Sequence, residues 1–405
     1  MIRLLSLSAS LFLAAPHLSA ETLRLSAPSP TDLVPSGIAA AKIAAVERHT
    51  ERELVQFSWP IEESAAIDFS PQPFLAESRE FWTTVEAAEL AKGVAFTTTA
   101  PGALIRLSPA EPGKRAGLDL SGMRIEIAGR SYTREQAVAV LADAGALKQA
   151  GAEFPEGTVA FRVRSELGAG PTRLILPKAS GRVLLHVFEP DSSLVLRLEA
   201  EPFVGADGRL RIAGGWAGLP KNARPIALTG LITAPDGYTQ NFELERRGED
   251  FAAEIALERG RGYGEGLWEV HLFAAAASAA GDLRRDVRTA FAVSQPSARL
   301  DGRVESIEEK GALVFALGVE NALAARYELR AVLTGTADDG SERPLAVTHA
   351  AVWLEPGRGA IPLRIEKEHL ARPGIGAPYA LRDLRLIRQG DQNLQERRDR
   401  PLHWR

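Results

Sequence analysis

Short stretches in which apolar and polar residues alternate, separated by turns rich in Gly, Pro and Asp, recur along most of the chain. Near the C-terminus, Tyr327, Leu329 and Leu333 fall on one face of a strand pattern, with Glu328 and Arg330 on the other. Such alternation predicts a half-buried β-strand, because successive side chains of a strand point to opposite faces. Many short strands of this kind predict an all-β fold made of tandem β-sandwiches.

The second half of the chain is predicted to form two Ig-like sandwiches, over residues 202–296 and 297–405. Pro296 supplies the boundary between them. Pro362 lacks a backbone N–H group, which predicts that its strand lies at a sheet edge. After Leu381 the apolar face of the last clear strand slips by one position, which predicts a β-bulge.

Residues 21–201 are predicted to form a larger N-terminal β-sandwich domain that carries one inserted helix. We expect this helix near residues 133–150, where apolar residues recur at helical spacing. Thr133 and Gln136 match a capping box at its start, and Gly151 is a residue type that ends helices. A catalytic α/β sheet needs repeated helices, so the pattern disfavours that class.

Residues 1–20 have the pattern of a secretory signal peptide. Arg3 gives a positive start, an apolar stretch follows, and Ser19-Ala20 offers a small-residue cleavage site. We therefore expect an exported protein, periplasmic or secreted, whose mature chain begins near Glu21. No later apolar run approaches the ~18 residues of a membrane-spanning helix, so we expect no transmembrane segment once the signal is removed.

The composition is that of an ordinary globular protein, with 45% hydrophobic and 25% charged residues. The chain contains no cysteine, which excludes thiol catalysis, cysteine-ligated zinc and iron–sulfur chemistry. Its formal net charge of −4 gives no reason to expect a nucleic-acid partner.

The sequence lacks two common hydrolase motifs, G-x-S-x-G and H-E-x-x-H. Its histidines are scattered. His271 alternates with Trp268, Val270 and Leu272 and is expected to face solvent, whereas His349 is expected to be a half-buried core histidine. We therefore assign no catalytic and no cofactor-binding residue from the sequence.

The densest polar cluster surrounds Gly340 and contains Asp338, Asp339 and Glu342. Asp339-Gly340 favours a hairpin turn, because glycine readily adopts the positive φ that such turns need. A calcium site needs about 6–8 oxygen ligands, and the EF-hand pattern is not met here. We interpret the cluster as a hairpin tip and keep the three acids as alternative calcium ligands; no other metal or cofactor is expected.

Four stretches, residues 88–109, 185–200, 327–365 and 377–387, together resemble an exported bacterial family of unknown function, DUF4785. The resemblance implies a signal peptide, an N-terminal β-domain and Ig-like modules over nearly the whole mature chain. It rests on strand and turn patterns, so it implies no catalytic residue.

The leading functional hypothesis is a non-enzymatic exported protein that binds a protein or glycan of the cell envelope, or another secreted protein. Trp216, Tyr238 and Trp404 are its candidate anchors, because aromatic residues dominate binding energy; burial in a core is the alternative for each. A second hypothesis is a hydrolase or lyase that acts on glycans, with loop acids of the N-terminal domain meeting an Arg or Tyr in a cleft. A third is an accessory protein or inhibitor of a secreted protease.

Overall fold

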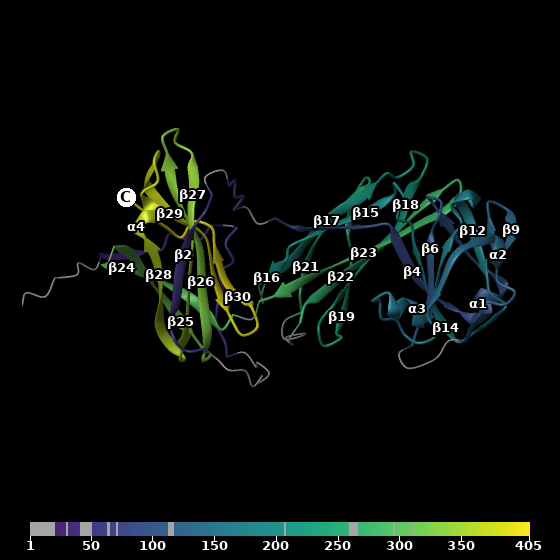
Figure 1. Cartoon of the computed structure of the whole chain (residues 1–405), viewed down its shortest axis with the longest axis horizontal. Helices are drawn as coiled ribbons and strands as arrows, with labels where there is room; N and C mark the ends of the chain where they lie inside the picture. Colours follow the sequence, from purple (N-terminus) through teal and green to yellow (C-terminus); the bar gives the residue numbers. More distant parts are fainter. Residues whose placement is uncertain are drawn as a thin grey trace, which may run out of the picture. The chain divides into compact units, whose positions relative to one another are not determined.

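The computed structural model (Figure 1) describes the chain over residues 21–29, 31–40, 51–62, 65–69, 72–111, 117–205, 208–258, 266–294, 296–309 and 311–405. The chain divides into two compact units. Unit 1 combines Met1–Pro71 with Ser294–Arg405, and unit 2 is Gln72–Val293. The predicted signal peptide lies outside the described residues.

Unit 2 begins with a β-sandwich that we call the N-terminal module. One sheet has the order β10-β11-β6-β14-β4, with bounds Val138–Asp143, Val159–Val163, Leu104–Pro109, Arg182–Phe188 and Glu80–Glu86. The other has the order β5-β12-β8-β9, with bounds Val94–Thr98, Gly170–Ile175, Arg124–Ile127 and Arg130–Thr133. A two-stranded ribbon and short helices complete it: β7 (Gly117–Asp119), β13 (Lys178–Ser180), α1 (Ala87–Lys92), α2 (Arg134–Ala137), α3 (Ala144–Gln149) and a 3-10 turn, η1 (Ser165–Leu167). Its core includes the fully buried Leu107, Ile125 and Leu185.

The middle module of unit 2 is a second sandwich. Its first sheet has the order β20-β21-β17-β15-β3, with bounds Glu245–Arg247, Asp250–Ala256, Arg209–Ala217, Val195–Ala200 and Phe74–Ser78. Its second has the order β16-β23-β22-β18-β19, with bounds Phe203–Val204, Gly281–Val293, Trp268–Ser278, Arg224–Thr233 and Thr239–Phe242. Trp268, Val270 and Leu272 are buried together, as their alternation predicts.

Unit 1 is a third sandwich. One sheet has the order β1-β24-β25-β28, with bounds Glu21–Arg24, Ala298–Glu309, Ala312–Asn321 and Gly357–Glu366. The other has the order β2-β27-β26-β29-β30, with β31 also pairing β29; the bounds are Val55–Pro60, Glu342–Leu354, Ala325–Ala337, Ile375–Arg388, Asn393–Arg398 and Leu402–Trp404. Helix α4 (Lys367–Leu370) follows β28. The prediction of an all-β chain of tandem sandwiches is confirmed.

The predicted single helix near residues 133–150 is wrong. The capping box of Thr133 and Gln136 does form, but it caps only the one turn of α2. The chain then becomes strand β10, which pairs antiparallel with β11, before α3 begins. The segment Val138–Asp143 is rich in Val and Ala, and pairing with β11 satisfies its backbone groups as well as a helix does; β-branched valine favours the strand.

The predicted domain bounds need two corrections. The segment assigned to a 21–201 domain contributes β1, which pairs β24, and β2, which pairs β27, so both belong to unit 1. Strand β15 pairs β3 and β17 and therefore belongs to the middle module, not to the N-terminal one. Alternation identifies a strand, but it does not identify a pairing partner that is distant in sequence.

Local features of unit 1 follow the sequence closely. Gly340 has φ of +79° in the turn between β26 and β27, which confirms the hairpin tip. Pro362 lies on β28, an edge strand, as predicted. Asp383 has φ of +49°, and the register between β26 and β29 shifts between Arg330 and Val332, which confirms a bulge after Leu381.

Candidate functional site

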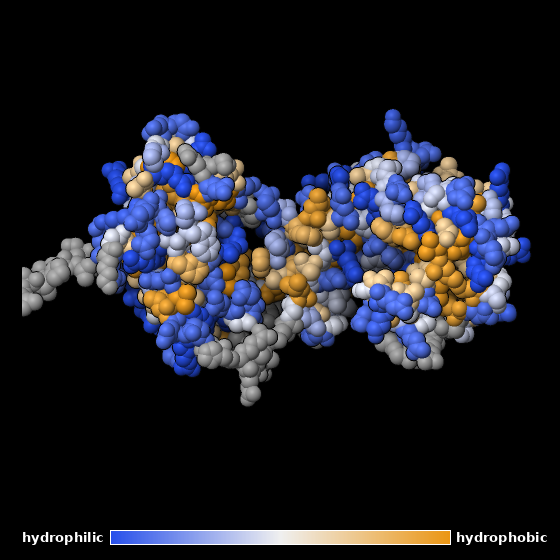
Figure 2. Space-filling view, viewed as in Figure 1, coloured by the Kyte–Doolittle hydropathy of each residue, from blue (hydrophilic) through white to orange (hydrophobic). Residues whose placement is uncertain are grey.

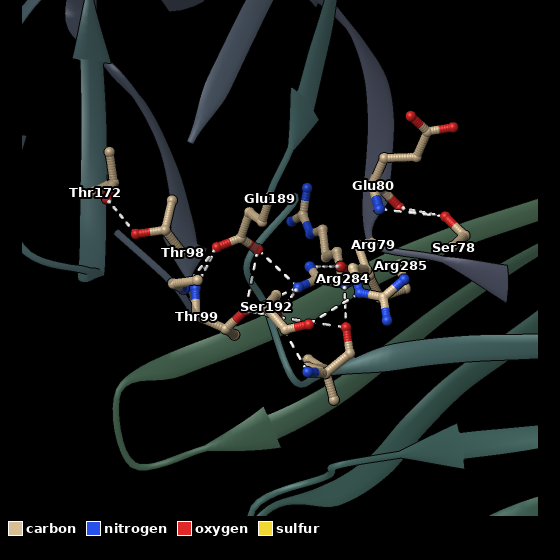
Figure 3. Close-up of polar contacts among 12 residues, drawn as sticks. Ser78, Arg79, Glu80, Thr98, Thr99, Thr172, Glu189, Ser192, Arg284 and Arg285 are labelled. Carbon is tan, nitrogen blue, oxygen red and sulfur yellow. Dashed lines mark hydrogen bonds and ion pairs between the residues drawn. The ribbon is translucent and has the colours of Figure 1, made fainter. Parts of the chain in front are cut away.

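A buried polar cluster joins the two modules of unit 2 (Figure 3). Glu189 follows β14, whereas Arg285 lies on β23 of the middle module, and their side chains approach to 2.7 Å between Oε2 and Nη2. The same Nη2 donates to the hydroxyls of Thr99 and Ser192 at 2.8 and 3.0 Å. Glu189 Oε1 accepts from the backbone N–H groups of Thr99 and Ala100.

This cluster is structural rather than catalytic. Both charged side chains are 0% exposed, so no substrate reaches them. Burial lowers the pKa of Arg285, and the charge of Glu189 opposes that shift. A buried ion pair of this kind contributes when its remaining donors and acceptors are satisfied, and here the hydroxyls and backbone groups satisfy them.

A second set of contacts at the same junction surrounds Trp82 on β4. Asp286 Oδ2 accepts from the Trp82 backbone N–H at 2.8 Å, and burial raises the pKa of Asp286 to about 7. The expectation that His271 faces solvent is wrong: it is 8% exposed, with its ring 4.6 Å from that of Trp82 and 3.9 Å from that of Phe273. Alternation placed His271 on the outer face of β22, but the N-terminal module covers that face. Burial, helped by the charge of Arg288, lowers the pKa of His271 to about 4.

A groove of about 440 Å³ lies beside this junction, between the β5-β12-β8 face and the turn that joins β22 to β23. Its lining includes two acids, Glu126 and Asp282, and two bases, Arg173 and Arg284. These four residues come from distant parts of the sequence. The groove therefore brings acids and bases that are distant in sequence to one surface.

The alternative calcium ligands do not gather around one point. Asp339 accepts from the backbone and hydroxyl of Ser341, which lowers its pKa, while Glu342 forms ion pairs with Arg382 and Arg400. Asp338 lies at the exposed turn, and its backbone N–H donates to a carbonyl across the sheet. Over the ranges that the structure describes, no group of three or more His, Asp or Glu residues is placed to hold a metal ion.

Of the three aromatic residues proposed as anchors, Trp216 lies in a core, and Tyr238 and Trp404 are partly buried against one. Trp216 is 7% exposed and Tyr238 packs against the same core of the middle module. Trp404 packs in unit 1 against Phe315 and Tyr379, with ring centroids 4.7 and 5.9 Å away. Each lies on a strand or next to one, and its large apolar ring turns towards the core, where burial is favourable.

A compact group of three rings, which we call the aromatic ladder, occurs instead on the outer face of unit 1, and its two rings on β2 are exposed. It consists of Phe57 and Trp59 on β2 and His349 on β27, and all three pairs of ring centroids lie 4.9 to 5.1 Å apart. The interplanar angles are 11° to 22°, so the rings are nearly parallel. Phe57 is 42% exposed and Trp59 is 46% exposed. In a space-filling view, apolar residues reach the surface in patches on both units (Figure 2).

Strand β2 is inverted in the sense that its apolar side chains face outward and its polar side chains face inward, the reverse of an ordinary sandwich strand. Its aromatic residues point outward, whereas Gln56 and Ser58 point inward opposite the buried Ala350 and Thr348. Within the described residues, Gln56 Oε1 and Ser58 Oγ are buried with no hydrogen-bond partner. A register slip of one residue would reverse both faces and bury the rings. In the observed register the rings are exposed, and the strand buries less apolar surface than it would in the shifted register.

Two arginines hold this register, Arg326 on β26 and Arg372 in the loop between α4 and β29. Arg326 Nη1 donates to the carbonyls of Glu51 and Glu53, at 2.6 and 2.9 Å, just before β2 begins. Arg372 Nη2 donates to the carbonyl of Ile61 at 2.6 Å, just after β2 ends. Both ends of the strand are thus fixed, and the ladder is organised in advance of any ligand.

His349 is half-buried, as predicted, but it lies on the outer face beside Phe57 and not in the core. Its Nδ1 lies 3.1 Å from Glu328 Oε1. Burial lowers the pKa of His349, although the Glu328 hydrogen bond acts in the opposite direction. The imidazole is therefore neutral at pH 7 and behaves as a flat polar ring in the ladder.

The sequence analysis missed the ladder, although a signal was present. In the stretch VQFSWP, Val55, Phe57 and Trp59 alternate with polar residues, and Pro60 marks an edge. Alternation does not tell which face is exposed, and the segment was assigned to another domain.

No described helix is long and apolar enough to cross a membrane. Two family models match the chain: the N-terminal domain of a domain of unknown function (DUF4785) over residues 46–189, and its C-terminal domain over residues 297–405. Together they cover more than half of the chain. No curated protein matches the chain significantly.

Among solved structures, the chain is similar to a DUF4785 family protein from Legionella pneumophila. The TM-score is 0.69 at 19% sequence identity, and the match covers 92% of this chain and 98% of that one. At that identity the likeness shows the fold. A match to the structure titled pT26-6p, with a TM-score of 0.20 and 8% identity over 53% of this chain and 64% of that one, carries no argument. The chain belongs to the DUF4785 family.

Proposed function

We propose that the protein is an exported, non-enzymatic binding protein of the bacterial cell envelope or its surroundings, and that the aromatic ladder is its recognition surface. The observation that carries the proposal is the inversion of β2. Phe57 and Trp59 are exposed while Gln56 and Ser58 occupy the inward face.

Burying a large apolar side chain contributes roughly 1.5–3 kcal/mol relative to leaving it exposed. The inverted strand forgoes part of that contribution at each of the two rings, and it also places inside two polar atoms that have no hydrogen-bond partner among the described residues. Rigid aromatic side chains held at a surface are the residues that most often dominate a binding interface. A partner that covers the rings recovers the missing burial.

The test compares wild-type protein with a Phe57→Ala, Trp59→Ala double variant for retention on a bacterial cell-envelope fraction. We expect retained protein to fall at least tenfold, because losing one aromatic hot spot typically costs more than about 1.4 kcal/mol of binding free energy. The matched control is Phe74→Ala, which removes a phenylalanine that is 56% exposed on β3 of unit 2.

Unchanged retention of the double variant, with the melting temperature preserved, would exclude the ladder as the recognition surface. Equal losses in the double variant and in Phe74→Ala would indicate nonspecific apolar adhesion and would also count against the proposal.

The glycan hydrolase or lyase keeps one observation in its favour, the groove lined by Glu126, Asp282, Arg173 and Arg284. It predicts that glycan turnover is measurable with the wild-type chain and is abolished by Glu126→Gln or Asp282→Asn. Turnover that survives both changes would remove the groove as its site.

A further inference from the structure

We propose that the aromatic ladder binds an acidic saccharide, whose sugar ring stacks on Trp59 and Phe57 and whose carboxylate pairs with Arg330. This proposal rests on the proposed function and specifies its ligand class. It is carried by the residues that share a row with the ladder across the outer face of the sheet.

The row crosses five strands in register. Phe57 pairs His349, which pairs Arg330, and Arg330 pairs Arg385, which in turn pairs Arg397. Paired residues in a sheet lie on the same face, so three rings at one edge are followed by a row of guanidinium groups. Two strand spacings, about 10 Å, separate Phe57 from Arg330, a distance that two linked sugar rings cover.

Arg330 is the cation of this row that has no partner among the described residues. Within the described residues it makes no hydrogen bond and no ion pair, unlike Arg385 and Arg397, which both pair with Asp383. Glu328 is the acid nearest in sequence on the same face, but its two carboxylate oxygens accept from His349 Nδ1 and Gln389 Nε2, both at 3.1 Å. The row therefore retains donors for an incoming anion.

The aromatic ladder and Arg330, at the two ends of the proposed site, favour different chemical groups. One ligand can carry both groups. An aromatic ring presents an apolar face that suits the C–H face of a sugar ring. A guanidinium group presents a planar fork that matches a carboxylate with two parallel hydrogen bonds. The neutral imidazole of His349 lies between them and adds no competing charge. A saccharide that carries carboxylates satisfies both ends at once, whereas a neutral glycan leaves Arg330 unpaired.

The experiment titrates the full chain with oligogalacturonate and, separately, with its methyl ester, in which the same rings carry no charge. We expect the acid form to bind more tightly and its affinity to fall as salt rises. Arg330→Gln should weaken binding of the acid about tenfold and leave binding of the ester unchanged, because a charge-assisted bidentate pair is lost. Arg330→Lys should restore part of the affinity, and Arg130→Gln, on an exposed strand of unit 2, should have no effect.

Equal affinity for acid and ester, or unaltered acid binding by Arg330→Gln, would overturn the proposal. If the ladder double variant loses envelope retention while neither probe binds, the acidic-saccharide proposal fails and the proposed function stands. If the wild type instead forms a concentration-dependent dimer that Trp59→Ala disrupts, the ladder is a contact between copies, and the saccharide proposal is overturned.

Discussion

The buried cluster of unit 2 and the aromatic ladder of unit 1 differ in exposure: the cluster places polar side chains away from water, and the ladder places large rings in contact with it. Each brings together residues from strands that are distant in sequence. In the cluster, the charges of Glu189 and Arg285 are fully buried and their hydrogen bonds are satisfied. In the ladder, large rings face water, and polar Gln56 and Ser58 face inward. Satisfied polar groups away from water hold a junction together, whereas exposed rings over inward polar side chains are the feature on which the proposed binding surface rests.

The largest expected effect is a loss of stability when the Glu189–Arg285 pair, which joins the two modules of unit 2, is broken. Glu189→Gln keeps an oxygen for the N–H groups of Thr99 and Ala100 but leaves the Arg285 charge buried without a counter-ion. We expect the free energy of unfolding of unit 2 to fall by about 3–5 kcal/mol, measured by denaturant unfolding, with envelope binding unchanged.

The control for that prediction is Glu254→Gln, which breaks the exposed pairs with Arg209 and Arg211 and should cost less than about 1 kcal/mol. Similar costs for the two substitutions would mean that the buried cluster does not stabilise the junction.

A smaller effect is expected from Asp286, and it depends on pH. Its folded-state pKa is raised from 3.8 to about 7, first by burial. The folded state therefore holds a proton that the unfolded state releases, so the contribution to stability is complete below about pH 4 and is lost as pH rises through about 7. Asp286→Asn removes this loss. We expect the variant to be more stable than wild type at pH 8, by at most about 4 kcal/mol at about 1.4 kcal/mol per pKa unit.

The pH dependence of stability that His271 contributes has the opposite sign to that of Asp286, which gives a second test. Its pKa is lowered from 6.5 to about 4 by burial, so its contribution is present above about pH 6.5 and is lost as pH falls towards 4. In the wild type the two dependences partly cancel between pH 4 and 7. In Asp286→Asn, hydrogen exchange of the β22 and β23 amides should show stability rising with pH over that window. A flat profile in this variant would contradict the role assigned to His271.

The smallest expected effect is on the stability of unit 1. Trp59→Ser removes a ring that is 46% exposed, so we expect the free energy of unfolding to change by less than about 1 kcal/mol. Thermal unfolding measures it. A loss of several kcal/mol would show that the ring belongs to the core, and the contrast between ladder and cluster would fail.

Local physics allowed much of unit 1 to be predicted from the sequence. The burial of Tyr327 and Leu329, the turn at Gly340 and the edge position of Pro362 all depend on neighbours within a few residues. Alternation, positive φ and the missing N–H of proline are properties that a short stretch reveals by itself.

The remaining features depend on partners that are distant in sequence. Nothing within VQFSWP reveals that β2 pairs β27, or that Arg326 and Arg372 fix its ends with the rings outward. His271 was expected to face solvent because alternation does not show that Trp82 covers its face. The segment Val138–Asp143 became a strand because β11 was available to pair with it. In each case a contact with a residue distant in sequence decided between two arrangements that the local sequence permits equally well.

The central claim is that the aromatic ladder is the surface that a partner covers. The most direct measurement is hydroxyl-radical footprinting of the full chain with and without a bacterial cell-envelope fraction, read by mass spectrometry. The account predicts that Phe57 and Trp59 lose labelling when the fraction is present, while Phe74, which is exposed on unit 2, is labelled equally in both samples. Undiminished labelling of Phe57 and Trp59 in protein that is demonstrably retained by the fraction would contradict it.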